Sequence, residues 1–155
     1  MSGPDALSLE ITSDPAELPK VRTTVRNWSK RHDWQEDQIA DIVLAVDEAL
    51  SNVIRHGYDG EPGHKIKVAA RMIEDPSHGP GLEISIRDFG KQVELDSIRG
   101  RDLDDLRPGG LGVHIIRSVM SCTKYSHADG GGMQLVMRKY KHRAGEDSQS
   151  PTEKP

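Results

Sequence analysis

The spacing of apolar side chains along the first third of the chain predicts one strand and two helices. Apolar and polar residues alternate over 7–11, which is typical of a short, half-buried strand. Over 15–31 the apolar residues recur every three or four positions behind Ser-Asp-Pro, which predicts a first helix. A second helix is predicted to open at 33–36 and to continue to His56, with Gly57 in the left-handed conformation that ends many helices.

The second half of the chain contains shorter apolar runs separated by turn-forming residues. Residues 74–81 are too polar and too rich in glycine and proline for a regular element, so we expect a turn there. Residues 91–108 lack apolar periodicity, and such a long loop in a small domain is uncommon unless it is a lid or binding loop. A third helix is predicted at 113–120. The remaining strands are predicted at 66–70, 82–88, 124–127 and 133–140.

The order of these elements favours a two-layer α+β sandwich. Helices gather early in the chain and hairpin-like strands gather late, which argues against a parallel, doubly wound sheet. We expect a mixed, mostly antiparallel sheet that is covered on one face by helices, in a single domain over residues 7–140. Residues 1–6 are expected to be flexible, and the polar, aperiodic tail at 141–155 is expected to be disordered.

Composition and charge narrow the possible functions. The 155 residues fit one domain with a sizeable core, and the net charge of −4 gives no electrostatic reason to expect a nucleic-acid partner. No apolar run approaches the ~18 residues that cross a bilayer, and no secretory signal is recognisable, so a cytoplasmic protein is expected. The single cysteine, Cys122, cannot form an internal disulfide and follows apolar residues, so we interpret it as a core residue.

A glutamate and an asparagine lie one turn apart on the otherwise apolar second helix. At about 100° per residue, Glu48, Asn52 and Arg55 share one stripe. The carboxylate could accept a proton or orient a hydroxyl group, and the amide oxygen could bind a hard cation such as Mg²⁺. The alternative is that these residues form the solvated face that any amphipathic helix has. The opposite, core-facing stripe is predicted to contain Ile39, Val43, Val46, Leu50 and Val53.

Two glycine-containing segments lie further along the chain. Asp88 ends the clearest predicted strand and Gly90 follows two residues later, which fits a turn as well as a ligand contact. Gly110 and Gly112 lie just before the helix predicted at 113–120, where exposed N–H groups and the helix dipole favour phosphate. Neither a Walker A sequence nor a dinucleotide-binding fingerprint is present. Three arginines of the preceding loop could face a phosphate or be solvated: Arg99, Arg101 and Arg107.

Together and in this order, these segments resemble the GHKL ATPase superfamily of gyrases, heat-shock chaperones, histidine kinases and mismatch-repair proteins. Glu48 and Asn52 look like its N-box, residues 88–90 like its first glycine box, and residues 110–112 like its second. The string that begins at Glu48 is very similar to that of the small anti-sigma factors that are also serine/threonine protein kinases. The resemblance covers residues 7–140 and implies the Bergerat-type ATP-binding fold.

The resemblance implies a role for each of these residues. Asn52 would hold Mg²⁺ against the phosphates of ATP, and Glu48 would be the general base toward a partner's serine or threonine hydroxyl. Asp88 would accept a hydrogen bond from the adenine amino group, and Gly90 would let the backbone approach the base. The lid that folds over the phosphates would contain Gly110, Leu111 and Gly112.

The resemblance also implies partners. The protein would be an anti-sigma factor that binds a sigma factor in one state and phosphorylates an anti-anti-sigma protein of the STAS type in the other. Phosphorylation adds charge that weakens one of the two competing complexes. A homodimer is the assembly that the resemblance suggests, and no direct contact with nucleic acid or membrane is expected.

Two positions depart from the family pattern. Gln92 replaces the second glycine of Asp-x-Gly-x-Gly, and Met133 stands where the late hairpin often has a threonine near the adenine. These departures leave open a second possibility, a binding module that holds a nucleotide, or none, and does no chemistry. A third possibility is an ATPase that acts on a regulator unrelated to transcription.

Overall fold

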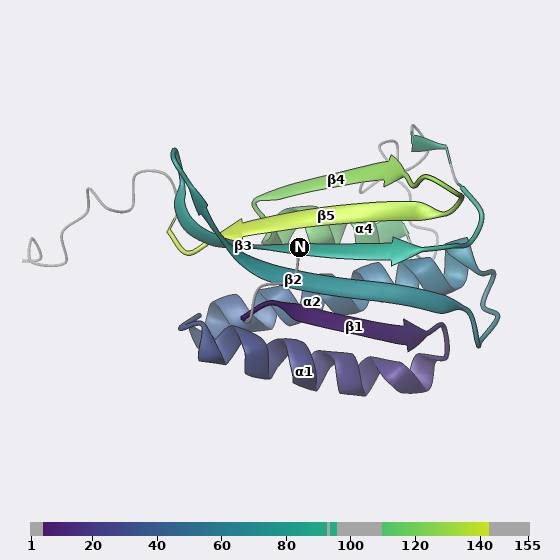
Figure 1. Cartoon of the computed structure of the whole chain (residues 1–155), viewed down its shortest axis with the longest axis horizontal. Helices are drawn as coiled ribbons and strands as arrows, with labels where there is room; N and C mark the ends of the chain where they lie inside the picture. The colour runs from purple at the N-terminus through teal and green to yellow at the C-terminus, as the bar shows by residue number, and fades with distance from the viewer. Residues whose placement is uncertain (1–4, 93, 96–109, 143–155) are drawn as a thin grey trace, which may run out of the picture.

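The computed structural model describes residues 5–92, 94–95 and 110–142 and shows an α+β protein (Figure 1). Most of the predicted loop at 91–108, its three arginines, and the tail from 143 lie outside the described residues. The helical elements are a 3₁₀ turn Pro15–Glu17, α1 (Leu18–Arg31), α2 (Glu36–Asn52), a π-helical turn Val53–Gly57 and α4 (Gly110–Val119). The strands are β1 (Leu7–Thr12), β2 (Lys65–Asp75), β3 (Gly79–Asp88), β4 (Cys122–His127) and β5 (Met133–Tyr140).

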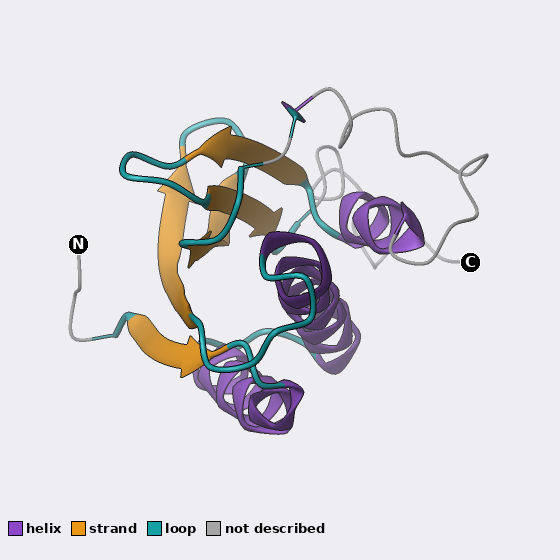
Figure 2. Ribbon diagram, turned by 90° about the vertical axis from the view of Figure 1, so that its right-hand side faces the viewer, coloured by secondary structure: helices purple, strands orange, loops and turns teal. Residues whose placement is uncertain are grey.

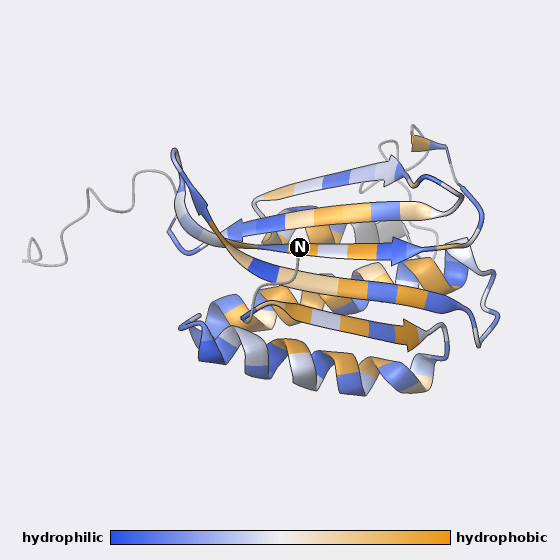
Figure 3. Ribbon diagram, viewed as in Figure 1, coloured by the Kyte–Doolittle hydropathy of each residue, from blue (hydrophilic) through white to orange (hydrophobic). Residues whose placement is uncertain are grey.

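The sheet has five strands in the order β1-β2-β3-β5-β4, and α1, α2 and α4 lie on one of its faces (Figure 2). The predicted α+β sandwich is therefore confirmed. All four strand pairings are antiparallel, so the described sheet has no parallel pair and is not mixed as predicted. Apolar and polar positions alternate along the strands (Figure 3). Along β3 and β5 buried positions alternate with less buried ones, as expected for a sheet with one face against the helices.

The core lies between the sheet and the helices, and α2 supplies its centre. Four of the five predicted core residues of this helix are at most 7% exposed, and Val53 is partly buried. The buried surface is wider than one stripe because α2 packs against both α1 and α4. It also includes Ile42, Ala45 and Ala49.

The turn predicted at 74–81 is shorter than expected. Strand β2 continues to Asp75 and β3 begins at Gly79, and these two residues are paired across the hairpin. The Asp75 carboxylate accepts hydrogen bonds from the N–H groups of Ser77 and His78, at 2.8 and 3.0 Å. Gly79 has a positive φ of 77° that closes the turn. Local hydrogen bonds thus permit a tight hairpin where composition alone suggested irregular structure.

Two further predictions are wrong. Gly57 is not a left-handed C-cap, because the chain continues past Asn52 as a π-helical turn, and the first positive φ values come at Asp59 and Gly60. Cys122 is exposed rather than buried. It begins an edge strand opposite Arg138, and the apolar residues before it belong to α4.

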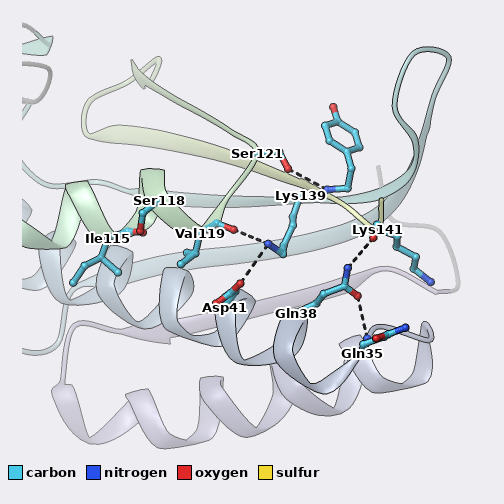
Figure 4. Close-up of polar contacts among 10 residues, drawn as sticks. Gln35, Gln38, Asp41, Ile115, Ser118, Val119, Ser121, Lys139 and Lys141 are labelled. Carbon is cyan, nitrogen blue, oxygen red and sulfur yellow. Dashed lines mark hydrogen bonds and ion pairs between the residues drawn. The ribbon is translucent and has the colours of Figure 1, made fainter. Parts of the chain in front are cut away.

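At the end of the sandwich where β3 begins, polar contacts fasten α2 and α4 to β5 (Figure 4). The Lys139 ammonium donates to the carbonyl oxygen of Val119 at 2.6 Å and lies 3.6 Å from the Asp41 carboxylate. The Gln38 side chain donates to the carbonyl oxygen of Lys141 at 2.9 Å. Helix α4 therefore ends, and α2 begins, at this end of the sheet.

Candidate functional site

Asp88 is the buried carboxylate at the end of the central strand β3, with only 3% of its surface exposed. Its Oδ1 accepts hydrogen bonds from the N–H groups of Gly90 at 3.0 Å and Met133 at 3.2 Å. Burial raises the pKa of this carboxyl, and the two N–H donors and the nearby Arg87 charge oppose the rise. Within the described ranges Oδ2 accepts no hydrogen bond, so it is available to a donor from a ligand.

The segment after α2 packs directly against this aspartate. A Cβ atom added to Gly90 would overlap the carbonyl oxygen of Gly57 and lie 3.0 Å from Cδ1 of Tyr58. A Cβ atom added to Gly57 would lie 3.6 Å from the Asp88 carboxyl carbon, which is an ordinary contact. The N–H of Lys91 donates to the Gly57 carbonyl at 3.1 Å. Gly90 is thus required by close approach of two backbone segments, whether or not a ligand is bound.

Tyr58 is a site residue that the sequence reasoning did not single out. It is 7% exposed, its hydroxyl donates to the Lys65 carbonyl at 2.6 Å, and it accepts from the Phe89 N–H at 2.7 Å. Burial raises the pKa of this phenol, and the Asp88 charge adds to the rise against the Phe89 hydrogen bond. The neutral phenol therefore connects β2 to the residue after Asp88. In the sequence, the one indication that Tyr58 belongs to the site is its position directly after Gly57, at the end of the string that begins at Glu48.

The two residues that depart from the family pattern have defined contacts. The Gln92 amide donates to the carbonyl oxygens of Ala128 and Gly132, each at 3.2 Å, so it fastens the β4–β5 turn to the segment after Asp88. Met133 supplies a backbone donor to Asp88, while its side chain packs against Leu95 and Tyr125.

The β4–β5 turn also approaches the end of β3 closely. A Cβ atom on Gly132 would overlap the carbonyl oxygen of Asp88. Arg87 donates to the carbonyl oxygens of Asp129 at 3.0 Å and Gly131 at 2.9 Å. The glycines of this turn therefore allow the backbone contact that positions the Met133 N–H.

Glu48 and Asn52 lie on α2 as predicted, and both are half-buried. Asn52 Oδ1 accepts a long hydrogen bond from Arg55 at 3.4 Å, whereas its Nδ2 is buried without a partner among the described residues. Glu48 lines a shallow depression of about 340 Å³ between α2 and the start of α1. No described contact joins Glu48 or Asn52 to Asp88. Asn52 precedes Gly57, the residue packed against Asp88, by five residues, which is about 7 Å along a helix axis.

The predicted phosphate-binding glycines begin α4. Gly110, Leu111 and Gly112 form its first turn, and this helix packs against α2. The start of α4 lies at the Asp88 end, because Val119 at its other end is held by Lys139 where β3 begins. The end of α2, the end of β3 and the N-terminus of α4 therefore meet at one end of the sandwich.

The described residues fit a magnesium ion only with help from a ligand. No three His, Cys, Asp or Glu side chains in the described part of the chain gather into a metal site. An ion beside the Asn52 amide would need phosphate and water oxygens to complete its coordination, as Mg²⁺ commonly does. Among the described helices, none has the length and apolarity to span a bilayer.

Two curated relatives are matched over most of their length and of this chain. It is 27% identical over 144 residues to the serine-protein kinase RsbW of Listeria innocua, covering 88% of this chain and 87% of that protein. It is 28% identical over 148 residues to the RsbW of Halalkalibacterium halodurans, covering 90% and 86%.

Solved structures with a similar fold include the RsbU and RsbW domains of Rv1364c from Mycobacterium tuberculosis. The TM-score is 0.64 at 22% identity, covering 89% of this chain and 33% of that chain. The SiaB–SiaC complex of Pseudomonas aeruginosa gives a TM-score of 0.56 at 15% identity, covering 86% and 88%. The family described as the histidine kinase-like ATPase domain matches residues 11–139, most of the chain, and the protein belongs to this family.

Proposed function

We propose that this protein binds ATP with Mg²⁺ and transfers the γ-phosphoryl group to a serine or threonine of an anti-anti-sigma partner of the STAS type. In its other state it would hold a sigma factor inactive. The main observation behind this proposal is the buried Asp88 carboxylate, at the end of the sandwich where α2 ends and α4 begins. Its Oδ2 accepts no hydrogen bond from the described residues. The RsbW relatives, named as serine-protein kinases, support this reading.

Asp88 would recognise the adenine amino group. Both donors to Oδ1 are backbone N–H groups, so that oxygen is held in place and Oδ2 is left as the acceptor for a ligand. A charged acceptor in a buried setting gives a stronger hydrogen bond than a neutral one. Gly90 and Gly57 keep side chains away from this position.

Glu48 and Asn52 would serve the phosphate end of the nucleotide. The Asn52 amide oxygen would bind Mg²⁺ together with the phosphates, and its loose 3.4 Å contact with Arg55 is weak enough to be exchanged. Glu48 would orient and deprotonate the attacking hydroxyl of the partner. The backbone N–H groups at the start of α4 would face the phosphates, with Gly110, Leu111 and Gly112 at the base of the lid.

A partner-binding module without chemistry is the second candidate. It is favoured by the position of Glu48, which lines a depression beside α1 and makes no described contact with the Asp88 site. An ATPase that acts on another kind of regulator is the third. A cytoplasmic location and a homodimer are part of the first proposal.

A phosphoryl-transfer assay separates these candidates. The protein is incubated with labelled ATP, Mg²⁺ and candidate STAS-type antagonists, beside Glu48→Ala, Asn52→Ala and the exposed control Glu36→Gln. We expect both site variants to lose transfer, by a factor of about 10² or more for Glu48→Ala, and the control to retain it. Asn52→Ala should also lose Mg²⁺-dependent nucleotide binding.

Two results would count against the kinase. ATP binding without transfer to any antagonist would favour the binding module. Failure of the wild-type protein to bind any adenine nucleotide would remove both nucleotide-dependent candidates.

A further inference from the structure

The outward face of the sheet carries an exposed aromatic ring surrounded by three cations. Phe89 is 42% exposed, and the Arg87 guanidinium lies 4.3 Å from its ring centroid. The ammonium groups of Lys65 and Lys67 lie 5.4 and 5.9 Å from the same centroid. We refer to these four residues as the Phe89 cluster. Cation–π contacts of this kind hold the cations in place without neutralising them.

The cations of the Phe89 cluster form no ion pair with a carboxylate within the described part of the chain. Neither lysine forms an ion pair with a described carboxylate, and Arg87 donates only to carbonyl oxygens. The acidic residues of this sheet face include Glu83 and Glu10, and Glu10 lies directly across from Lys67 in the β1–β2 pairing. Glu83 already forms ion pairs with Arg71 at 3.0 Å and Arg138 at 2.8 Å, so it does not neutralise the cluster. Three cations thus gather at one place in a protein of net charge −4, and the Glu10 carboxylate on the neighbouring strand offsets only one of them.

Small side chains beside the cluster leave the sheet open to a close approach. Ser8, Ala69 and Ser85 are consecutive partners across β1, β2 and β3. They are part of the lining of a shallow depression of about 400 Å³. The helices cover the opposite face (Figure 2), and no described element covers this one.

We propose that the Phe89 cluster is a docking surface for an extended, acidic segment of a partner protein. Lys65 and Lys67 are two residues apart on β2, so their Cα atoms are separated by about 7 Å. Alternate carboxylates of an extended peptide have the same repeat and would face both lysines. Because no described element covers this surface, such a segment can reach it without any rearrangement of the fold.

A protein segment fits this surface better than a nucleic acid. Arg87 already lies over the Phe89 ring, so that face of the ring is not free to stack on a base. The chain as a whole is acidic, which repels a long polyanion at a distance. A short acidic segment meets only the local positive charge.

The test uses the full-length protein and a fluorescent peptide of alternating glutamate and threonine, with binding followed by anisotropy at low and high salt. We expect saturable binding that weakens with salt. The double variant Lys65→Glu/Lys67→Glu should raise Kd about tenfold or more. The control Lys20→Glu/Lys30→Glu makes the same charge change on α1 and should alter Kd by less than about twofold.

Further arms identify the ligand class. Phe89→Ala should weaken peptide binding while the thermal unfolding midpoint stays near that of the wild type, because the ring is exposed. A single-stranded oligonucleotide and phosphatidylserine vesicles are tested with the same variants. Absence of peptide binding, an equal loss in the α1 control, or tighter cluster-dependent binding of oligonucleotide or vesicles would each overturn the proposal. The readout requires neither ATP nor transfer, so it is independent of the proposed kinase activity.

Discussion

The backbone N–H of Met133 donates a hydrogen bond to Oδ1 of Asp88 at 3.2 Å, across the pairing of β3 and β5. The donor belongs to the main chain, so the bond does not depend on which side chain occupies this position. A methionine at this position, where the family resemblance would place a threonine, therefore still supplies the donor to Asp88. The Met133 side chain packs against Tyr125 and takes no part in this hydrogen bond.

Replacing Asp88 by asparagine separates ligand recognition from folding. Asp88→Asn exchanges one acceptor oxygen for a donor, so we expect adenine-nucleotide affinity to fall by about tenfold or more, measured by calorimetry. The free energy of unfolding at pH 7 should not fall, because the variant buries no charge.

The pH dependence has a definite sign. The folded state raises the pKa of Asp88 above its ordinary value of 3.8, so folded protein binds the proton more tightly than unfolded protein. Wild type should therefore gain stability relative to Asp88→Asn as pH falls through the raised pKa toward 3.8. Urea titrations across this range measure the difference, and a gain with rising pH would contradict the assignment.

Glu83 shows the opposite pH behaviour. Burial tends to raise its pKa, but hydrogen bonds from Arg138 at 2.8 Å and Arg71 at 3.0 Å outweigh this and hold the pKa below the ordinary value of 4.5. The stabilisation should be complete above pH 4.5 and lost as pH falls through the lower folded pKa. Glu83→Gln should cost about 1 kcal/mol at pH 7.

The matched control for this prediction is Glu10→Gln, which removes an exposed carboxylate from the same sheet face. It should leave the unfolding free energy unchanged within about 0.5 kcal/mol. Equal effects of the two variants at pH 7 would show that the pairing with the two arginines does not stabilise the fold.

The two glycines beside Asp88 should respond differently to alanine. Gly90→Ala places a methyl group on the Gly57 carbonyl oxygen, and we expect a loss of roughly 2–3 kcal/mol in the unfolding free energy. Gly57→Ala adds a methyl group at 3.6 Å from the Asp88 carboxyl carbon and should change stability by less than about 1 kcal/mol. Thermal and urea unfolding compare the pair, and similar losses would be inconsistent with the described backbone contact.

Gln92 should stabilise the β4–β5 turn through its two hydrogen bonds. Gln92→Gly restores the family glycine but removes both hydrogen bonds to the turn, so we expect a loss of about 1–2 kcal/mol. Gln92→Glu keeps the length of the side chain but turns a carboxylate toward two carbonyl oxygens. It should destabilise at least as much at pH 7 and recover as the carboxyl becomes protonated and can donate. A stabilising effect of the glycine variant would show that the turn does not need this contact.

The periodicity of apolar residues predicted most of the fold because the helices are amphipathic over several turns and the strands over several alternating residues. The predicted strand at 133–140 and the end of the helix at Arg31 agree with the structure. The same pattern cannot reveal a π-helical turn, since one extra residue hardly changes a hydrophobic stripe. The same pattern wrongly predicted that Cys122 is buried, because most of the apolar residues before it belong to α4, whereas Cys122 begins β4.

The candidate site was predictable in part. The order of motifs singled out Asp88 and Gly90, which share a hydrogen bond, and Glu48 and Asn52, which lie more than two turns and more than one turn, respectively, before the contact at Gly57. The hydrogen-bond partners of Asp88 were not predictable, because Met133 contributes its main-chain N–H, and the identity of a side chain does not indicate such a contact. The contact of Gln92 with the turn depends on pairing between strands distant in sequence.

The π-helical turn at Val53–Gly57 fits one more residue into this segment than an ordinary helical turn would. Its wide loop closes through the N–H of Tyr58, which donates to the carbonyl of Val53, five residues earlier, at 3.1 Å. An ordinary helical turn with one residue fewer spans nearly the same rotation about the helix axis, so deleting one residue of this turn would leave Gly57 and Tyr58 close to Asp88. Natural variants should therefore tolerate a one-residue deletion here better than an insertion.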